Sequence, residues 1–286
     1  MVSHLEYNYL TTLLDIDNGP ALSYKKINIV NREEDKELRI IATEMNFLNR
    51  YFEETPTKAI CVYRGNCNHI PKLMKLYPLE FHCYSVGTNL IKLEDEPNLI
   101  IFNQDFEESD LEKYVDKEVY FISNYENPGI NKNDKLIEIE FLRNQELHTE
   151  DMQKQLQICQ SLNPKVAFLK FRPPHYIENQ KKSFEYLTGL VFKTIFSSFK
   201  SIETRLLVTD FKTLTSWNLK RLNDQMFFYN NIIRESLVKP FKKFPQFKYT
   251  FDRTIFYWIL YDYFQKVGHQ NPQTKEFEKL FIFLKM

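Results

Sequence analysis

Glycine is scarce in this sequence, with only 6 among 286 residues. Glycine is the residue that lets a backbone pass close to a phosphate or a cofactor, so the scarcity argues against several phosphate-binding loops. The chain also has no CxxC pair among its four cysteines, no hydrophobic leader at MVSHLEYNYL, and no apolar run near the ~20 residues of a membrane span. These absences predict a reducing, intracellular compartment and no membrane segment.

A metal site is not expected either. Cys67, His69 and His82 could be grouped around an ion, but their spacing fits no standard zinc pattern.

Net charge is also missing, because 38 basic side chains balance 38 acidic ones. A free-standing, nonspecific nucleic-acid binder would be basic overall, so any RNA contact must come from a local patch or be shared with a partner. The charge is segregated: residues 94–118 hold ten acidic and two basic side chains, whereas residues 162–200 hold seven basic and two acidic. Residues 232–253 are again basic, six against two. Ordinary solvated surface is the alternative interpretation.

Short apolar runs alternate with helical segments along the chain. A helix is predicted over 34–52, where Leu38, Ile41, Met45 and Leu48 form one apolar face. Strands are predicted at 59–63, 80–86, 98–102, 118–123, 165–171 and 204–210, and helices at 70–77, 105–115, 142–162, 179–199, 212–238 and 251–266. This alternation predicts an α/β fold with a doubly wound, mostly parallel sheet and an aromatic helical cap. We expect one domain, 1–286, with an N-terminal arm (1–33), an α/β core (34–211) and a helical C-terminal region (212–286).

Ligands of such sheets bind beyond the carboxyl ends of the strands. Lys170 lies in the apolar run KVAFLKF, and Glu203 opens the next run. A lysine in a buried strand is costly unless it reaches a cleft or a carboxylate. A lysine held by a carboxylate could stabilise a developing alkoxide on a sugar hydroxyl. A structural ion pair at the sheet edge is the alternative.

The stretch LNPKVAFLKFRPPHY (162–176) resembles a segment of the poxvirus-type poly(A) polymerase small subunit, which is also the cap-specific mRNA 2′-O-methyltransferase. Further likenesses follow in the same order along the chain. They are IDN (16–18) with Tyr24, LRIIATEMNFL (38–48), ETRLL (203–207), MFFYNNIIRESLV (226–238) and FDRTIFYWILYDYF (251–264). The resemblance implies a Rossmann-like methyltransferase fold with an S-adenosylmethionine pocket, a cap pocket and a catalytic Lys-Asp-Lys-Glu set.

The catalytic set that the resemblance implies is only half kept. Its second lysine and its glutamate fall on Lys170 and Glu203. Its first lysine falls on Arg39, whose guanidinium does not deprotonate. Its aspartate falls on Asn124, which loses the charge that would contact the methionine ammonium.

The cofactor loop that the resemblance implies, CVYRGNCNHIPKL (61–73), departs further. It keeps His69 but carries Tyr63 and Cys67 where the family has glycines. The acidic residue expected to hold the ribose falls on Val86, which cannot accept hydrogen bonds. We therefore expect weak or absent S-adenosylmethionine binding and no methyl transfer.

The implied cap pocket would place Tyr24 and His175 on the two faces of the methylated guanine. Glu178 and Asp224 each lie one residue from the positions of the acidic partners of the guanine edge. A loop residue and a surface arm residue are the alternative interpretations of His175 and Tyr24.

The family's other role needs no methyl transfer, because the small subunit binds the catalytic poly(A) polymerase subunit and RNA. Lysines interleaved with aromatics are typical of sequence-tolerant single-strand binding, and here they are Lys181, Lys182, Lys239, Lys242 and Lys243. The first hypothesis is thus a cytoplasmic processivity subunit, in a virion or viral factory if the source is viral, forming a heterodimer. An active cap 2′-O-methyltransferase and a non-catalytic α/β interaction protein are the alternatives.

Overall fold

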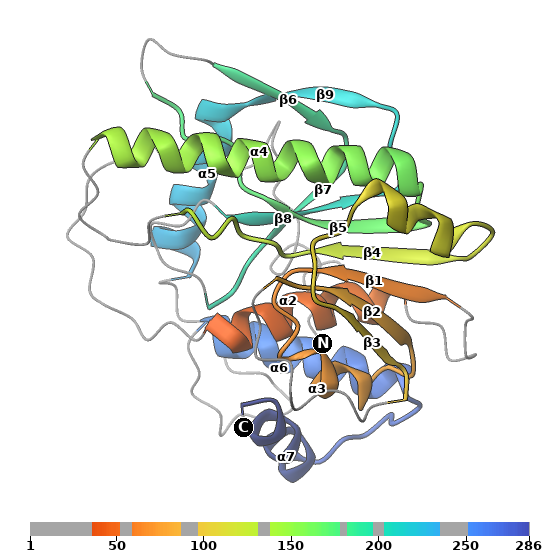
Figure 1. The fold of residues 1–286 in the computed structure, drawn as a ribbon. Coiled ribbons are helices and arrows are strands. Elements are labelled where there is room, and N and C mark those ends of the chain that lie inside the picture. Colours follow the sequence, from red (N-terminus) through yellow and green to blue (C-terminus); the bar gives the residue numbers. More distant parts are fainter. Residues whose placement is uncertain are drawn as a thin grey trace.

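A seven-stranded mixed sheet forms the centre of the computed structural model, which describes residues 36–51, 59–86, 97–130, 138–177, 182–196, 203–234 and 251–285 (Figure 1). The strand order is β3-β2-β1-β4-β5-β8-β7. Their bounds are β1 Ile60–Arg64, β2 Glu80–Tyr84, β3 Leu99–Phe102, β4 Val119–Ser123, β5 Val166–Phe171, β7 Leu190–Lys193 and β8 Thr204–Val208. The first five run parallel, and β8 is antiparallel to both β5 and β7. The predicted α/β class with a mostly parallel, Rossmann-like sheet is confirmed.

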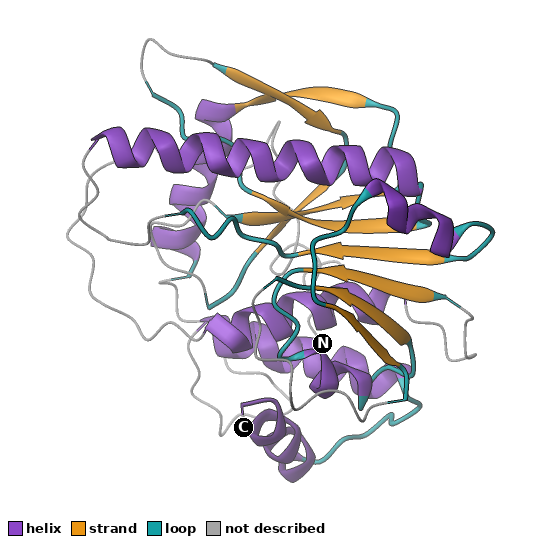
Figure 2. Cartoon of the chain, in the orientation of Figure 1, coloured by secondary structure: helices purple, strands orange, loops and turns teal. Residues whose placement is uncertain are grey.

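Helices cover both faces of this sheet (Figure 2). One core lies under α2 (Lys36–Tyr51), α6 (Phe251–Lys266) and α7 (Thr274–Lys285), and the other lies under α4 (Glu138–Leu162). Short α3 (Ile70–Met74) joins the first layer, and the 3-10 helix η2 (Glu108–Tyr114) joins the second. Strands β1, β4, β5 and β8 are buried at every position, as their apolar runs predict.

The helix α2 forms as its period predicts. Leu38, Ile41, Met45 and Leu48 are all at most 3% exposed, and they face the sheet. No helix in the described part of the chain combines the length and the apolar character that crossing a membrane requires.

The helix predicted over 179–199 is wrong, because β6 (Ser183–Leu187) and β7 occupy its described residues. Gly189 joins the two strands so close to β8 that a Cβ there would lie 2.3 Å from the Leu207 carbonyl oxygen. Phe184 and Tyr186 alternate with exposed Glu185, which is the period of a strand.

The helix predicted over 212–238 is wrong in its first part. Residues Leu214–Asn218 form β9, which pairs antiparallel with β6 in a separate two-stranded sheet. The helix α5 (Leu219–Phe228) starts only after β9, where the Asn218 side chain accepts a hydrogen bond from the Arg221 amide, and a π-helical turn, η3 (Tyr229–Ile233), follows. The C-terminal helix α7 was not predicted. The expected helical region 212–286 therefore begins with a strand that packs on the α/β core. The expected arm, 1–33, lies outside the described residues.

Candidate functional site

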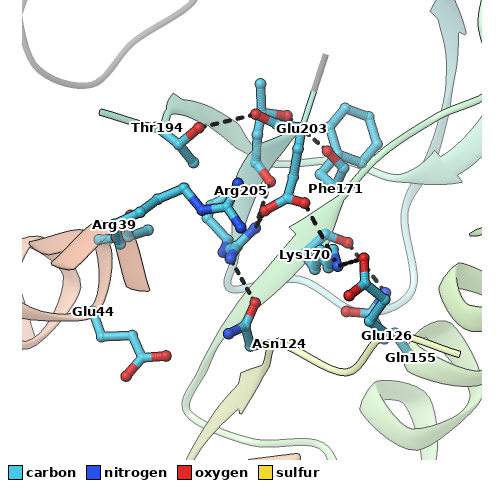
Figure 3. Close-up of polar contacts among 12 residues, drawn as sticks. Arg39, Glu44, Asn124, Glu126, Gln155, Lys170, Phe171, Thr194, Glu203 and Arg205 are labelled. Carbon is cyan, nitrogen blue, oxygen red and sulfur yellow. Dashed lines mark hydrogen bonds and ion pairs between the residues drawn. The ribbon is translucent and has the colours of Figure 1, made fainter. Parts of the chain in front are cut away.

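Lys170 and Glu203 meet at the carboxyl end of β5, as the sequence predicts (Figure 3). Lys170 Nζ lies 3.5 Å from a Glu203 carboxylate oxygen and 3.5 Å from a Glu126 carboxylate oxygen. Strand β8 runs antiparallel to β5, and Arg205 is the register partner of Lys170. Arg205 Nη1 donates to Glu203 Oε1 at 2.8 Å. The adjacent strands thus bring two cations and a carboxylate to one end of the sheet.

Asn124 and Arg39 join the same cluster. Arg205 Nη2 donates to Asn124 Oδ1 at 2.6 Å. Arg39 extends from α2 toward Glu203 and Arg205 (Figure 3), and its charge acts on Glu203. All four positions of the implied catalytic set therefore converge on one cluster, in which Asn124 is held through Arg205.

Electrostatics keep Glu203 ionised in spite of its burial. Burial alone would raise the pKa of this carboxyl, which is only 4% exposed. The charges of Lys170, Arg205, Arg39 and Arg172 outweigh burial and hold that pKa well below its usual range. The cluster is thus an ion network in which cations outnumber carboxylates.

Tyr63, the first of the implied cofactor positions, points into this network and is fully buried. Its hydroxyl donates to Glu44 Oε1 at 3.0 Å and accepts from Asn124 Nδ2 at 3.4 Å. His69 Nε2 lies 2.6 Å from the other oxygen of Glu44, and its ring packs edge-on against Tyr63 at 5.5 Å. Tyr63, Glu44 and His69 thus form a polar cluster that continues the ion network across the carboxyl end of β1.

Cys67 and Val86 lie at the other two implied cofactor positions. Cys67 is fully buried, and its hydrogen bond with Cys83 outweighs burial and, with the nearby His69 charge, lowers its pKa to about 7. Val86 is 60% exposed beyond the end of β2. No group of three or more His, Cys, Asp or Glu residues that could hold a metal occurs within the described ranges.

At the positions that the resemblance assigns to S-adenosylmethionine, the polar side chains contact one another. The Asn124 amide is already engaged by Arg205 and Tyr63. Tyr63 places a whole phenol where a glycine would leave room, and Val86 has no group to accept from a ribose hydroxyl.

The implied cap and RNA positions are only partly described. The His175 amide donates to Gln145 Oε1 at 2.9 Å, and its ring lies 5.5 Å from Phe141. Burial, then the nearby Arg172 charge, lowers the pKa of His175 to about 4. Asp224 on α5 accepts from Lys220 at 2.7 Å, and Lys182 is exposed before β6. Tyr24, Glu178, Lys181, Lys239, Lys242 and Lys243 lie outside the described residues.

Sequence reasoning missed two members of the network: Glu44 and Arg205. Arg205 had a usable signal, since it interrupts the apolar run TRLLV as Lys170 interrupts KVAFLKF. Glu44 had a weaker one, because it stands three residues after Ile41 and four before Leu48, at the spacing of the apolar face of the predicted helix. Glu126 lies just after β4, in the range 124–126 where ligands of such sheets are expected, but its contact with Lys170 was not predicted.

Comparison with known proteins complements this geometry. No curated protein matches the chain. A family model described as the poly A polymerase regulatory subunit matches residues 7–286, nearly the whole chain. The resemblance to the poly(A) polymerase small subunit is thereby confirmed, and a catalytic polymerase subunit is the partner that this family implies. The chain belongs to the poly(A) polymerase regulatory subunit family.

Proposed function

We propose that this chain is a non-catalytic regulatory subunit that binds RNA for a poly(A) polymerase, on a methyltransferase-like fold whose cofactor site has been lost. One observation supports the loss of the cofactor site. Contacts run without a break from Lys170 through Glu203, Arg205, Asn124, Tyr63 and Glu44 to His69. The chain's own side chains therefore occupy the positions that the resemblance assigns to cofactor and catalysis.

Lys170 is poorly placed to act on a ribose hydroxyl. Its Nζ lies between Glu126 and Glu203, at 3.5 Å from each. A substrate hydroxyl would have to displace one of these carboxylates to reach the amine. The side chain is 9% exposed, so the displacement would also break a mostly buried ion pair.

The same cluster has the charge to attract a phosphate. Four cations, Lys170, Arg205, Arg39 and Arg172, act on Glu203, with Glu126 as the second carboxylate. The Nε atoms of Arg39 and Arg172 are buried and have no hydrogen-bond partner within the described ranges. The Arg39 and Arg172 side chains as a whole are partly exposed, and guanidinium groups suit phosphate oxygens, so this end of the sheet supports contact with an RNA backbone.

The cap is a second proposed ligand, for which His175 is the main support. With a pKa near 4, its ring is neutral at physiological pH, and a neutral ring does not repel a cationic methylated guanine. Stacking on such rings contributes roughly 1–3 kcal/mol per base.

The regulatory role predicts that the chain binds the catalytic subunit and lengthens its poly(A) tails. Pull-down with the catalytic polymerase subunit, followed by tailing of a labelled RNA with and without this chain, measures both. We expect capture, and tails that end early when the chain is omitted. Failure of capture together with unchanged tail length would refute the role.

The RNA contact has its own variant. Lys239, Lys242 and Lys243 changed together to Glu should shorten tails and lower RNA affinity roughly tenfold or more at low salt, while capture persists. Lys275→Glu with Lys279→Glu on exposed positions of α7 is the matched control. Equal effects of the two variants would remove the RNA assignment.

The alternative of an active 2′-O-methyltransferase is tested by calorimetry. We expect no saturable heat with S-adenosylmethionine, because Tyr63 and the engaged Asn124 occupy its place. A dissociation constant below about 1 mM, with methyl transfer to capped RNA, would establish the alternative instead.

In a second titration, a cap analogue should bind the wild type and bind His175→Ala at least several-fold more weakly. Equal binding by both proteins would remove the cap site.

A further inference from the structure

Among the buried polar atoms on the α4 side of the sheet that lack a hydrogen-bond partner within the described part of the chain, four belong to residues around the carboxyl ends of β1 and β4. They are Arg64 Nη1, Ser123 Oγ, Gln155 Oε1 and Tyr186 OH. The residues are at most 2% exposed and come from β1, β4, α4 and β6. Unpartnered buried polar atoms are rare in folded proteins, so four of them require an explanation.

The four residues lie on one face of the sheet. Arg64 and Ser123 are register partners on adjacent parallel strands. They alternate with residues of the opposite face, and they therefore point the same way as Val62 and Phe121, which pack in the core beneath α4.

Gln155 and Tyr186 reach the same region from above. Gln155 Nε2 donates to the Lys170 carbonyl oxygen at 3.1 Å, which fixes its amide over the end of β5. Tyr186 packs in the same core, its ring 5.9 Å from that of Phe171. Its hydroxyl is close enough to Arg64 and Cys159 for both to influence its pKa.

Arg64 itself is held rigidly by Asp105, a carboxylate that Lys154 also contacts at 2.7 Å. Its Nε and Nη2 donate to the two oxygens of Asp105 at 2.6 and 2.9 Å. Its guanidinium lies 3.9 Å from the centre of the Tyr125 ring. Nη1 is the remaining guanidinium nitrogen and has no hydrogen-bond partner within the described residues, so it is a directed donor on an ion-paired side chain.

We propose that these four atoms form a binding site for a small uncharged hydrogen-bonding ligand, namely ordered water, enclosed between α4 and the carboxyl ends of β1, β4 and β5. Arg64 Nη1 only donates and Gln155 Oε1 only accepts, whereas the two hydroxyls do both. A water molecule needs two to four such partners, and it can bridge donors and acceptors that do not meet directly. An ion is disfavoured because two carboxylates, Asp105 and the nearby Asp151, offset the charges of Arg64 and Lys154. The site lies on the face of the sheet opposite the Lys170 network, and it does not depend on the proposed function.

Thermal unfolding of the full chain tests this site through the sign of the change. If water satisfies the two hydroxyls, Tyr186→Phe and Ser123→Ala each remove a made hydrogen bond, and the Tm should fall by about 2 °C. If the site is dry, each change removes an unsatisfied buried atom, and the Tm should stay level or rise. Tyr77→Phe gives the change in Tm for removing a hydrogen bond that is formed, since the buried Tyr77 hydroxyl donates to Asn49 Oδ1 at 2.6 Å.

A high-resolution crystal structure supplies the second readout. We expect an ordered solvent molecule bridging at least two of the four atoms. Direct bonds among the four, a site without density, or a Tm that stays level or rises in both variants would each overturn the proposal.

Discussion

Replacing Arg234 with alanine is expected to lower the free energy of unfolding by about 3–5 kcal/mol, because it strands a buried carboxylate. Arg234 Nε donates to Asp252 Oδ1 at 2.9 Å, Nη2 binds the second oxygen, and Nη1 donates to Asn230 at 3.1 Å. The Arg234 and Asp252 side chains are only 2% and 11% exposed. Asp252 also accepts from the Phe196 amide at 3.2 Å. Phe196 has a φ of 56°, which is unfavourable for a non-glycine residue. The pair thus joins the π-helical turn, the start of α6 and the end of β7.

Denaturant unfolding of Arg234→Ala measures this effect, and Lys220→Ala is its matched control. Lys220 and Asp224 also form an ion pair, at 2.7 Å, but the lysine side chain is 54% exposed. Exposed pairs contribute little, so the control should unfold at nearly the same denaturant concentration as the wild type. Losses of similar size in the two variants would mean that burial does not strengthen the dependence on the Arg234–Asp252 pair.

The central strands were predictable because they are buried on both faces. Runs such as VAFLKF leave no polar face, and a parallel sheet between two helical layers is the arrangement that accommodates them. The outer elements were harder to predict. In β6 and β9 only one face is buried, and β9 exposes Leu214 and Ser216 beside buried Trp217. Five residues of such a pattern are too few to separate a strand from a helix turn, and Gly189 was the one local signal against a helix.

The site was predictable where one residue type was anomalous in its local context. Lys170 and Glu203 stand out because charges are costly in apolar strands, and they do contact each other. The partners of Tyr63 were not predictable, because its contact with Glu44 joins residues 19 apart and its contact with Asn124 joins residues 61 apart. Such contacts depend on how α2 lies on the sheet, and no local pattern records this.

Stability should fall as the pH drops below about 6.5, and His148 should be a major cause. The His148 side chain on α4 is 3% exposed, and its Nε2 has no partner among the described residues. Burial, then the charges of Arg172 and Lys170, outweighs Glu126 and Glu203 and lowers its pKa to about 3. In the unfolded chain His148 has the ordinary pKa of a histidine and takes up a proton near pH 6.5, whereas in the folded chain it stays neutral at that pH. The stability that neutral His148 contributes is therefore complete above that pH and is lost progressively down to about pH 3.

The free energy of unfolding of His148→Gln should depend less on pH. It should fall by about 2 kcal/mol less than that of the wild type between about pH 6.5 and 4.5. Asp151, one turn further along α4, supplies a control of opposite sign. Burial raises its pKa to about 6 against the Asn127 amide and the charges of Arg64 and Lys170, so its protonation favours the folded state as the pH falls from 6. The free energy of unfolding of Asp151→Asn should therefore fall more steeply as the pH drops. The new amide oxygen can still accept from the Asn127 amide, which in the wild type lies 3.0 Å from Asp151 Oδ2. Urea unfolding of the three proteins across this range measures both slopes. If the free energy of unfolding falls equally with pH in all three proteins, neither side chain controls the acid response of the fold.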